Sequence, residues 1–120
     1  MKEVEVALEL ERFMRSNGSE GVAFDLIVAS GLRSAMPHGV ASQKPIRSGE
    51  LVTFDMGAVI GGYHADMTRT IAVGEPSAQH RALHEAVQEA LEASVAAAGP
   101  GVSGRELDGI ARKVLARHGL

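Results

Sequence analysis

Two aspartates stand where a strand is expected. Asp55 and Asp66 fall within residues 51–73, LVTFDMGAVIGGYHADMTRTIAV, which alternate apolar and polar residues in the manner of a β-hairpin. Aspartate is depleted in strands because its short side chain prefers to bond to the backbone in turns. Carboxylates are also the ligands that hard divalent cations prefer, so the two acids are candidate metal ligands.

The pairing of the hairpin decides whether the two acids meet. Gly61 and Gly62 predict a two-residue turn, because primed turns need positive φ, which glycine adopts at little cost. With that turn, Asp55 pairs with Thr68, and side chains alternate between the two faces of each strand. Asp55 and Asp66 then share the polar face as diagonal neighbours, with Cα atoms about 7–8 Å apart.

Two interpretations of this polar face stay open from the residues alone. Two like charges at this separation repel, and a pair of divalent cations about 3.5–4 Å apart is a natural counter-ion, because carboxylates can bridge the two ions. The alternative is a solvated sheet face on which aspartate is tolerated without a ligand. A one-residue slip at the turn would move one acid to the other face.

Histidines supply the other candidate site residues. His38, in the segment MPHG, lies in a long connection and is a candidate catalytic or substrate-binding residue. The alternative for His38 is a solvated loop histidine. His64 shares the polar face with the two aspartates but adjoins the turn, so it is the weaker candidate for substrate binding. The chain has no cysteine, which excludes thiolate metal sites and disulfides.

The elements that carry these residues follow from apolar periodicity and from turn residues. In chain order the sequence predicts a helix over 4–14 that ends at Asn17-Gly18, a strand over 22–30, a connection over 31–50, the hairpin, and two helices separated by 99–101. Ser103 and Glu106 form the capping box of the last helix. This order predicts an α+β fold, in which residues 1–120 form a single domain and the helices cover one face of an antiparallel sheet.

The composition argues for a globular domain and against nucleic-acid-binding, membrane-spanning and secreted proteins. The chain has 120 residues, of which 45% are hydrophobic, as in a globular domain. A net charge of −3 and 3% aromatic residues argue against nucleic acid as a partner. No apolar run reaches the length of a membrane span, and the charged N-terminal residues do not form a secretory signal. A cytoplasmic location without a membrane partner is therefore expected.

Two segments resemble a known family. ASGLRSAMPHG (residues 29–39) and FDMGAVIGGYHADMTRT (residues 54–70) are similar to the pita-bread metallopeptidases. This family contains Xaa-Pro aminopeptidases, Xaa-Pro dipeptidases (prolidases), methionine aminopeptidases and the non-peptidase creatinases. Within this family, the two segments most resemble those of the Xaa-Pro aminopeptidases and dipeptidases. The similarity extends to the first helix and to the two closing helices.

The resemblance implies a site and a reaction. Asp55 and Asp66 match two ligands of a binuclear centre that holds divalent metal ions, Mn, Co or Zn. His38 matches a substrate-site histidine that hydrogen-bonds near the scissile amide. In the family a metal-bridging water hydrolyses the bond before proline, so a proline-containing peptide is the implied substrate.

The family's site also needs a histidine and two glutamates, and the resemblance places these beyond Leu120. We therefore expect the first half of a pita-bread catalytic domain, a fragment that is inactive by itself. The alternative is a self-associating half-domain: a homodimer, or a larger assembly, that imitates the intact pita bread and binds metal without catalysis. A third interpretation is a structural fragment with vestigial aspartates.

Overall fold

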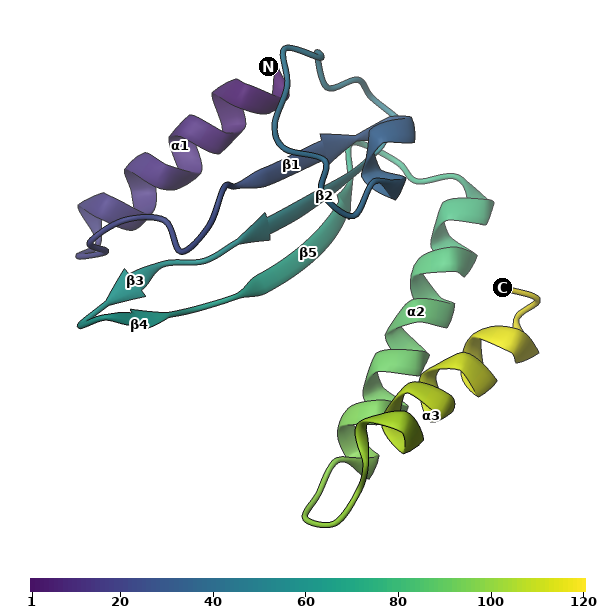
Figure 1. Ribbon diagram of the computed structural model, residues 1–120. Coiled ribbons are helices and arrows are strands. Elements are labelled where there is room, and N and C mark those ends of the chain that lie inside the picture. Colours follow the sequence, from purple (N-terminus) through teal and green to yellow (C-terminus); the bar gives the residue numbers. More distant parts are fainter. The chain divides into compact units, whose positions relative to one another are not determined.

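The computed structural model describes all of residues 1–120. The chain divides into two compact units, Met1–Pro76 and Ser77–Leu120. The first unit holds a helix, a sheet and a β-ribbon, and the second holds two helices (Figure 1). No helix combines the length and the apolar character that a membrane crossing requires. That residues 1–120 act as one domain stays a prediction.

Helix α1 (Glu3–Ser16) opens the first unit and packs against the sheet (Figure 1). At its end, Asn17 is the C-cap, and the Asn17 side-chain Nδ2 donates to the carbonyl of Phe13 at 2.8 Å. Gly18 follows with a φ of 96°, a conformation that glycine adopts without a Cβ penalty. The predicted first helix and its end at Asn17-Gly18 are confirmed.

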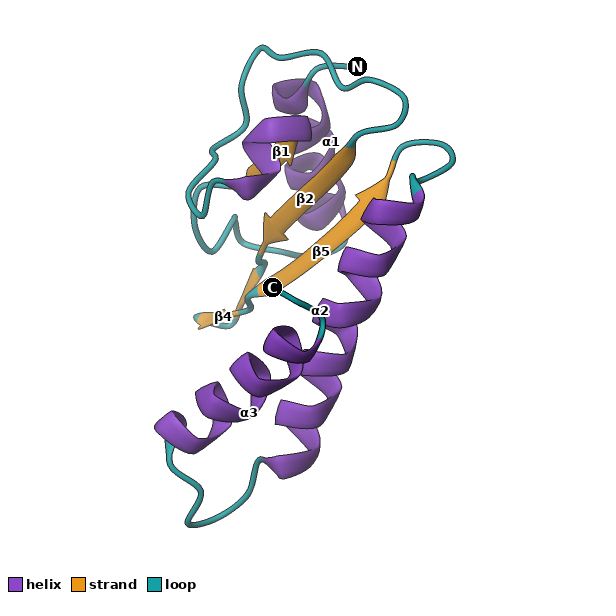
Figure 2. Ribbon diagram, turned by 90° about the vertical axis from the view of Figure 1, so that its right-hand side faces the viewer, coloured by secondary structure: helices purple, strands orange, loops and turns teal.

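A three-stranded antiparallel sheet forms the centre of this unit. Its strands are β1 (Ile27–Ser30), β2 (Leu51–Met56) and β5 (Met67–Ala72), in the order β1-β2-β5 (Figure 2). Strand β1 is buried along its whole length, and Val28 and Ala29 are fully enclosed. The core of this unit is therefore built around β1. Burying one valine side chain contributes about 1.5–3 kcal/mol to the free energy of unfolding.

The strand predicted over 22–30 is regular only from Ile27 onward. Upstream of Ile27, the N–H of Ala23 donates to the carbonyl of Gly57 at 2.8 Å, without a continuous ladder on either side. The residue types over 22–30 favour a strand throughout, but a regular strand also needs a partner strand in register. Only the last four residues find that partner in β2.

The hairpin has the predicted register. Beyond β2 and β5 it continues as a two-stranded ribbon of β3 (Val59–Ile60) and β4 (Tyr63–His64). The turn residues 61–62 have φ of 57° and 78°, the positive values of a primed turn. Asp55 lies opposite Thr68, as expected. The pairing on both sides of the turn therefore matches the prediction, although residues 65–66 lie between the two ladders and belong to neither.

The connection from β1 to β2 begins with a short 3₁₀ helix, η1 (Gly31–Ala35), which the sequence did not predict. Such short turns lack the extended apolar period by which longer helices are recognised. After η1, the chain passes through His38 and returns to the sheet at Leu51.

The second unit is a helical hairpin of α2 (Ala78–Ala97) and α3 (Gly104–Arg117). The predicted capping box is present at the start of α3. The Glu106 carboxylate accepts from the N–H of Ser103 at 2.8 Å, and the Ser103 hydroxyl accepts from the N–H of Glu106 at 3.3 Å. The two closing helices and the boundary between them are confirmed.

Candidate functional site

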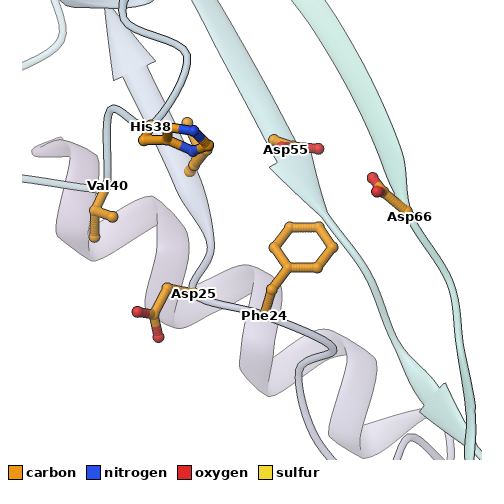
Figure 3. Close-up of a pocket in the computed structure, with 7 residues that line it drawn as sticks. Phe24, Asp25, His38, Val40, Asp55 and Asp66 are labelled. Carbon is orange, nitrogen blue, oxygen red and sulfur yellow. The ribbon is translucent and has the colours of Figure 1, made fainter.

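A pocket of about 370 Å³ opens beside the sheet of the first unit (Figure 3). Its lining residues are Phe24, Asp25, Ile27, His38, Val40, Asp55 and Asp66. Three residues that the sequence singled out therefore meet at one cavity, although they come from three separate segments of the chain.

Asp55 is placed by pairing on both sides of β2. It lies opposite Ile27 of β1 and opposite Thr68 of β5. Thr68 Oγ1 donates a hydrogen bond of 2.8 Å to Asp55 Oδ1. Hydrogen bonds to an ionised acceptor are stronger than neutral ones, so this contact fixes the orientation of the carboxylate. Thr53 and Thr70 continue the same polar face, with their hydroxyl oxygens 3.1 Å apart.

Asp66 reaches the same pocket from the adjacent segment, immediately before β5. In Figure 3, the carboxylates of Asp55 and Asp66 turn toward the space between their two strands. Gly57 makes this approach possible, because a Cβ at that position would collide with the carbonyl oxygen of Ala65. The two arms of the hairpin therefore approach each other closely at Gly57, a position that lies between Asp55 and Asp66 in the sequence.

His38 lies across the pocket from the two aspartates, in the connection that follows η1 (Figure 3). The side chain is exposed, and the backbone of the next residue, Gly39, is buried against Ala29 of β1. The sequence placed His38 in a loop without fixing where that loop lies. The structure brings it to the same cavity as Asp55 and Asp66.

His64 is exposed and is not one of the residues that line this pocket. Its ring Nδ1 lies 3.3 Å from the backbone carbonyl oxygen of Ala23, outside the cavity lining. Its role in substrate binding stays a prediction, and no contact in the structure adds to it.

The pocket contains side-chain oxygen atoms of the type that bind divalent metal ions. Asp55 and Asp66 provide carboxylate oxygens, which divalent cations such as Mg²⁺, Mn²⁺ and Zn²⁺ accept as ligands. The chain contains no cluster of three or more His, Asp or Glu side chains arranged to hold a metal. The two aspartates therefore supply two donors, and a full coordination shell needs others in addition.

Four lining residues were not predicted: Phe24, Asp25, Ile27 and Val40. Phe24 and Asp25 lie just before the regular strand begins at Ile27. Figure 3 shows the ring of Phe24 turned toward the two aspartates and the carboxylate of Asp25 turned away from them. Val40 lies two residues after His38, and an apolar residue in a loop does not by itself indicate a pocket in the sequence.

Comparison with known proteins identifies the family. The model of metallopeptidase family M24 matches residues 1–120, so the chain belongs to this family. The resemblance to the pita-bread metallopeptidases is thereby confirmed. The predicted α+β fold class is confirmed by the structure and by its match to a solved prolidase.

Two curated relatives are Xaa-Pro dipeptidases. That of Pyrococcus furiosus is 50% identical over 118 residues, which cover 98% of this chain and 34% of the relative. That of Lactobacillus delbrueckii subsp. lactis is 37% identical over 119 residues, which cover 99% of this chain and 31% of the relative. The chain thus spans about a third of the length of the curated relatives it matches.

Solved structures agree closely with the fold. The prolidase from Pyrococcus furiosus superimposes with a TM-score of 0.96 at 50% identity, over 99% of this chain and 35% of that structure. The X-Pro aminopeptidase from Thermotoga maritima gives a TM-score of 0.96 at 47% identity, over 99% of this chain and 34% of that structure.

Proposed function

We propose that this chain contributes two metal ligands and one substrate-contacting histidine to a metallopeptidase of the Xaa-Pro dipeptidase or aminopeptidase type. The observation that carries the proposal is the shared pocket of His38, Asp55 and Asp66. The names of the relatives support the substrate class, since Xaa-Pro dipeptidases are 50% identical to this chain.

In this proposal Asp55 and Asp66 hold divalent metal ions, with Mn, Co and Zn as the candidates. Divalent ions supply Lewis-acid activation of water and of the scissile carbonyl when bound. Thr68 keeps the Asp55 carboxylate turned toward the pocket through its 2.8 Å hydrogen bond. His38 donates a hydrogen bond near the scissile amide of a proline-containing peptide.

The apolar members of the lining complete the proposed binding site. Phe24, Ile27 and Val40 form walls without hydrogen-bonding groups of their own. Apolar side chains of this kind suit the apolar ring of a proline residue.

Two carboxylates do not fill the coordination shells of two ions, so hydrolysis requires donors in addition to Asp55 and Asp66. We expect these donors to be a histidine and two glutamates, as the family resemblance implies. Residues 1–120 alone are therefore expected to bind metal weakly and to hydrolyse peptides slowly or not at all.

A peptidase assay tests the proposal. Alanyl-proline is incubated with the protein and Mn²⁺, and release of free proline is measured for the parent, for Asp66→Ala and for Asp108→Ala. Asp108 is an exposed aspartate of α3, so its variant controls for the loss of one negative charge. Even slow hydrolysis that needs Mn²⁺ and that only Asp66→Ala abolishes supports the peptidase. If residues 1–120 alone hydrolyse nothing, as the need for further donors leads us to expect, binding of alanyl-proline that needs Mn²⁺ and that only Asp66→Ala abolishes supports it instead. Hydrolysis that survives Asp66→Ala contradicts it.

Self-association is the second candidate function, and one feature of the sheet favours it. Strand β5 is the last strand of the order β1-β2-β5, so one edge of its six residues has no partner strand. Exposed strand edges tend to pair with other chains. In this alternative, two copies form a homodimer that holds metal between them without hydrolysis. Light scattering at micromolar concentrations measures the mass, and a monodisperse monomer would rule the homodimer out.

A further inference from the structure

The structure contains a buried charge that the proposed chemistry does not use. Glu3, in the first turn of α1, is fully buried. Its Oε1 accepts from the N–H and the hydroxyl of Ser30, both at 2.8 Å. Its Oε2 accepts from the N–H of Ser42 at 3.1 Å, from the Ser42 hydroxyl at 2.6 Å and from Arg33 Nε at 3.1 Å. Burying a carboxylate is costly, and these five donors offset that cost.

The donors flank the segment that carries His38. Arg33 lies in η1 before His38, and Ser42 lies after it. Arg33 is also engaged on its other side, because its Nη2 donates to the carbonyl of Val40 at 2.7 Å. The N–H of Val40 in turn donates to the carbonyl of His38 at 2.9 Å. A continuous chain of hydrogen bonds therefore runs from the buried carboxylate to the backbone of His38.

Two further contacts link this segment to the strands of the pocket. Val40 forms an antiparallel bridge with Ile27, which itself lies opposite Asp55. Gly39 packs so closely on β1 that a Cβ at that position would lie 3.1 Å from the Cβ of Ala29. The backbone beside His38 is thus held in register with the strand that carries Asp55.

We propose that Glu3 and Arg33 are positioning residues for His38. The Glu3 carboxylate fixes the Arg33 guanidinium, and Arg33 fixes Val40, so the imidazole of His38 stays at a set place across the pocket from Asp55 and Asp66. Arginine suits this role because the donors of its rigid planar group point in fixed directions, Nε to Glu3 and Nη2 to Val40, whereas the lysine ammonium is a point charge on a flexible stem. The inference rests on the proposed function for one point, the contact between His38 and substrate.

A double-mutant cycle separates positioning from a purely structural role. The dissociation constant of alanyl-proline is measured in the presence of Co²⁺ for the parent, Arg33→Gln, His38→Gln and the double variant. We expect Arg33→Gln to weaken binding about fivefold, the scale of one lost hydrogen bond. The double variant should bind no more weakly than His38→Gln alone, because Arg33 acts through His38. Independent, additive effects would overturn the inference.

Arg12→Gln is the matched control, since Arg12 also pairs with a glutamate on α1 but is 72% exposed and outside this network. It should leave the dissociation constant unchanged. A matching loss in Arg12→Gln would mean that any missing arginine weakens binding, and the inference would fall.

Amide hydrogen exchange provides a readout that needs neither metal nor substrate. Arg33→Gln should speed exchange at the N–H of Val40 about tenfold and leave the N–H of Val52, in the centre of the sheet, unchanged. If the parent binds no alanyl-proline, the proposed function fails, and exchange at Val40 still decides the inference. An unchanged Val40 rate, with or without peptide binding, contradicts it.

Discussion

Thr68 on β5 donates a 2.8 Å hydrogen bond across the sheet to the carboxylate of Asp55 on β2. The two residues are direct cross-strand partners, so the backbone ladder places both ends of this bond. One oxygen of Asp55 is thereby occupied by a neutral donor, and the other is left for a ligand. This contact links the register of the hairpin to the chemistry proposed for the pocket.

Replacing Thr68 by valine should weaken metal binding. The change keeps the shape of the side chain but removes the donor, so the Asp55 carboxylate loses its fixed orientation. Loss of such an outer contact typically lowers metal affinity by about tenfold or more. Calorimetric titration with Co²⁺ measures the effect. Thr70→Val is the control, because Thr70 lies on the same face but contacts Thr53 and not Asp55; equal losses in the two variants would argue against an orienting role.

Removing the charge from both aspartates should stabilise the metal-free protein. Asp55→Asn with Asp66→Asn abolishes the repulsion between two carboxylates that share one pocket. The expected gain is about 0.2–1 kcal/mol, the scale of cross-strand pairs. Thermal melting at low ionic strength measures the gain, which should shrink at high salt because salt screens the repulsion. A lower melting temperature than that of the parent would speak against the shared placement of the two acids.

Glu3 makes the stability of the first unit depend on pH. Burial alone raises the pKa of Glu3, but hydrogen bonds from Ser42 and Ser30 outweigh it and lower the pKa from 4.5 to about 2. A depressed pKa in the folded state means that the stabilisation is present above pH 4.5 and is lost as pH falls toward 2. The difference corresponds to about 3 kcal/mol.

Glu3→Gln should therefore flatten the loss of stability between pH 5 and pH 2 while lowering stability at pH 7. Urea unfolding at a series of pH values measures both effects. Glu9→Gln is the control, since Glu9 forms an exposed pair with Arg12 and is not buried. If Glu3→Gln retained the full acid dependence of the parent, another group would be responsible.

Gly57 should be intolerant of any side chain. Gly57→Ala would drive a Cβ into the carbonyl oxygen of Ala65 and push apart the two chains that carry Asp55 and Asp66. Overpacking of this kind costs about 1–3 kcal/mol, and it should weaken Co²⁺ binding as well. Gly109→Ala, in α3 where a Cβ meets nothing within 4 Å, should instead be neutral or stabilising. Equal melting temperatures for Gly57→Ala and the parent would contradict the close crossing.

The hairpin and its acid pair could be predicted from the sequence because their determinants are local. Gly61-Gly62 specifies the turn, and the period of two along each strand then assigns every side chain to a face. The register of Asp55 against Thr68 follows from these two rules, and the structure has that register.

The rest of the site depends on contacts between distant segments, which no local pattern encodes. Glu3 directly precedes the helix predicted over 4–14, and nothing in its sequence context distinguished it from Glu9, which is exposed. Its burial follows from its meeting Ser30 and Ser42, which lie far along the chain. The start of β1 at Ile27 likewise depends on a distant contact, its pairing with Asp55 of β2.

The proposed site depends above all on Asp55 and Asp66 holding divalent metal ions together. Calorimetric titration of the metal-free protein with Co²⁺, comparing the parent with Asp66→Ala and with the control Asp108→Ala, tests it most directly. We expect saturable binding in the parent and in Asp108→Ala, and none in Asp66→Ala. Binding that survives in Asp66→Ala, or a parent that binds no Co²⁺, would contradict it.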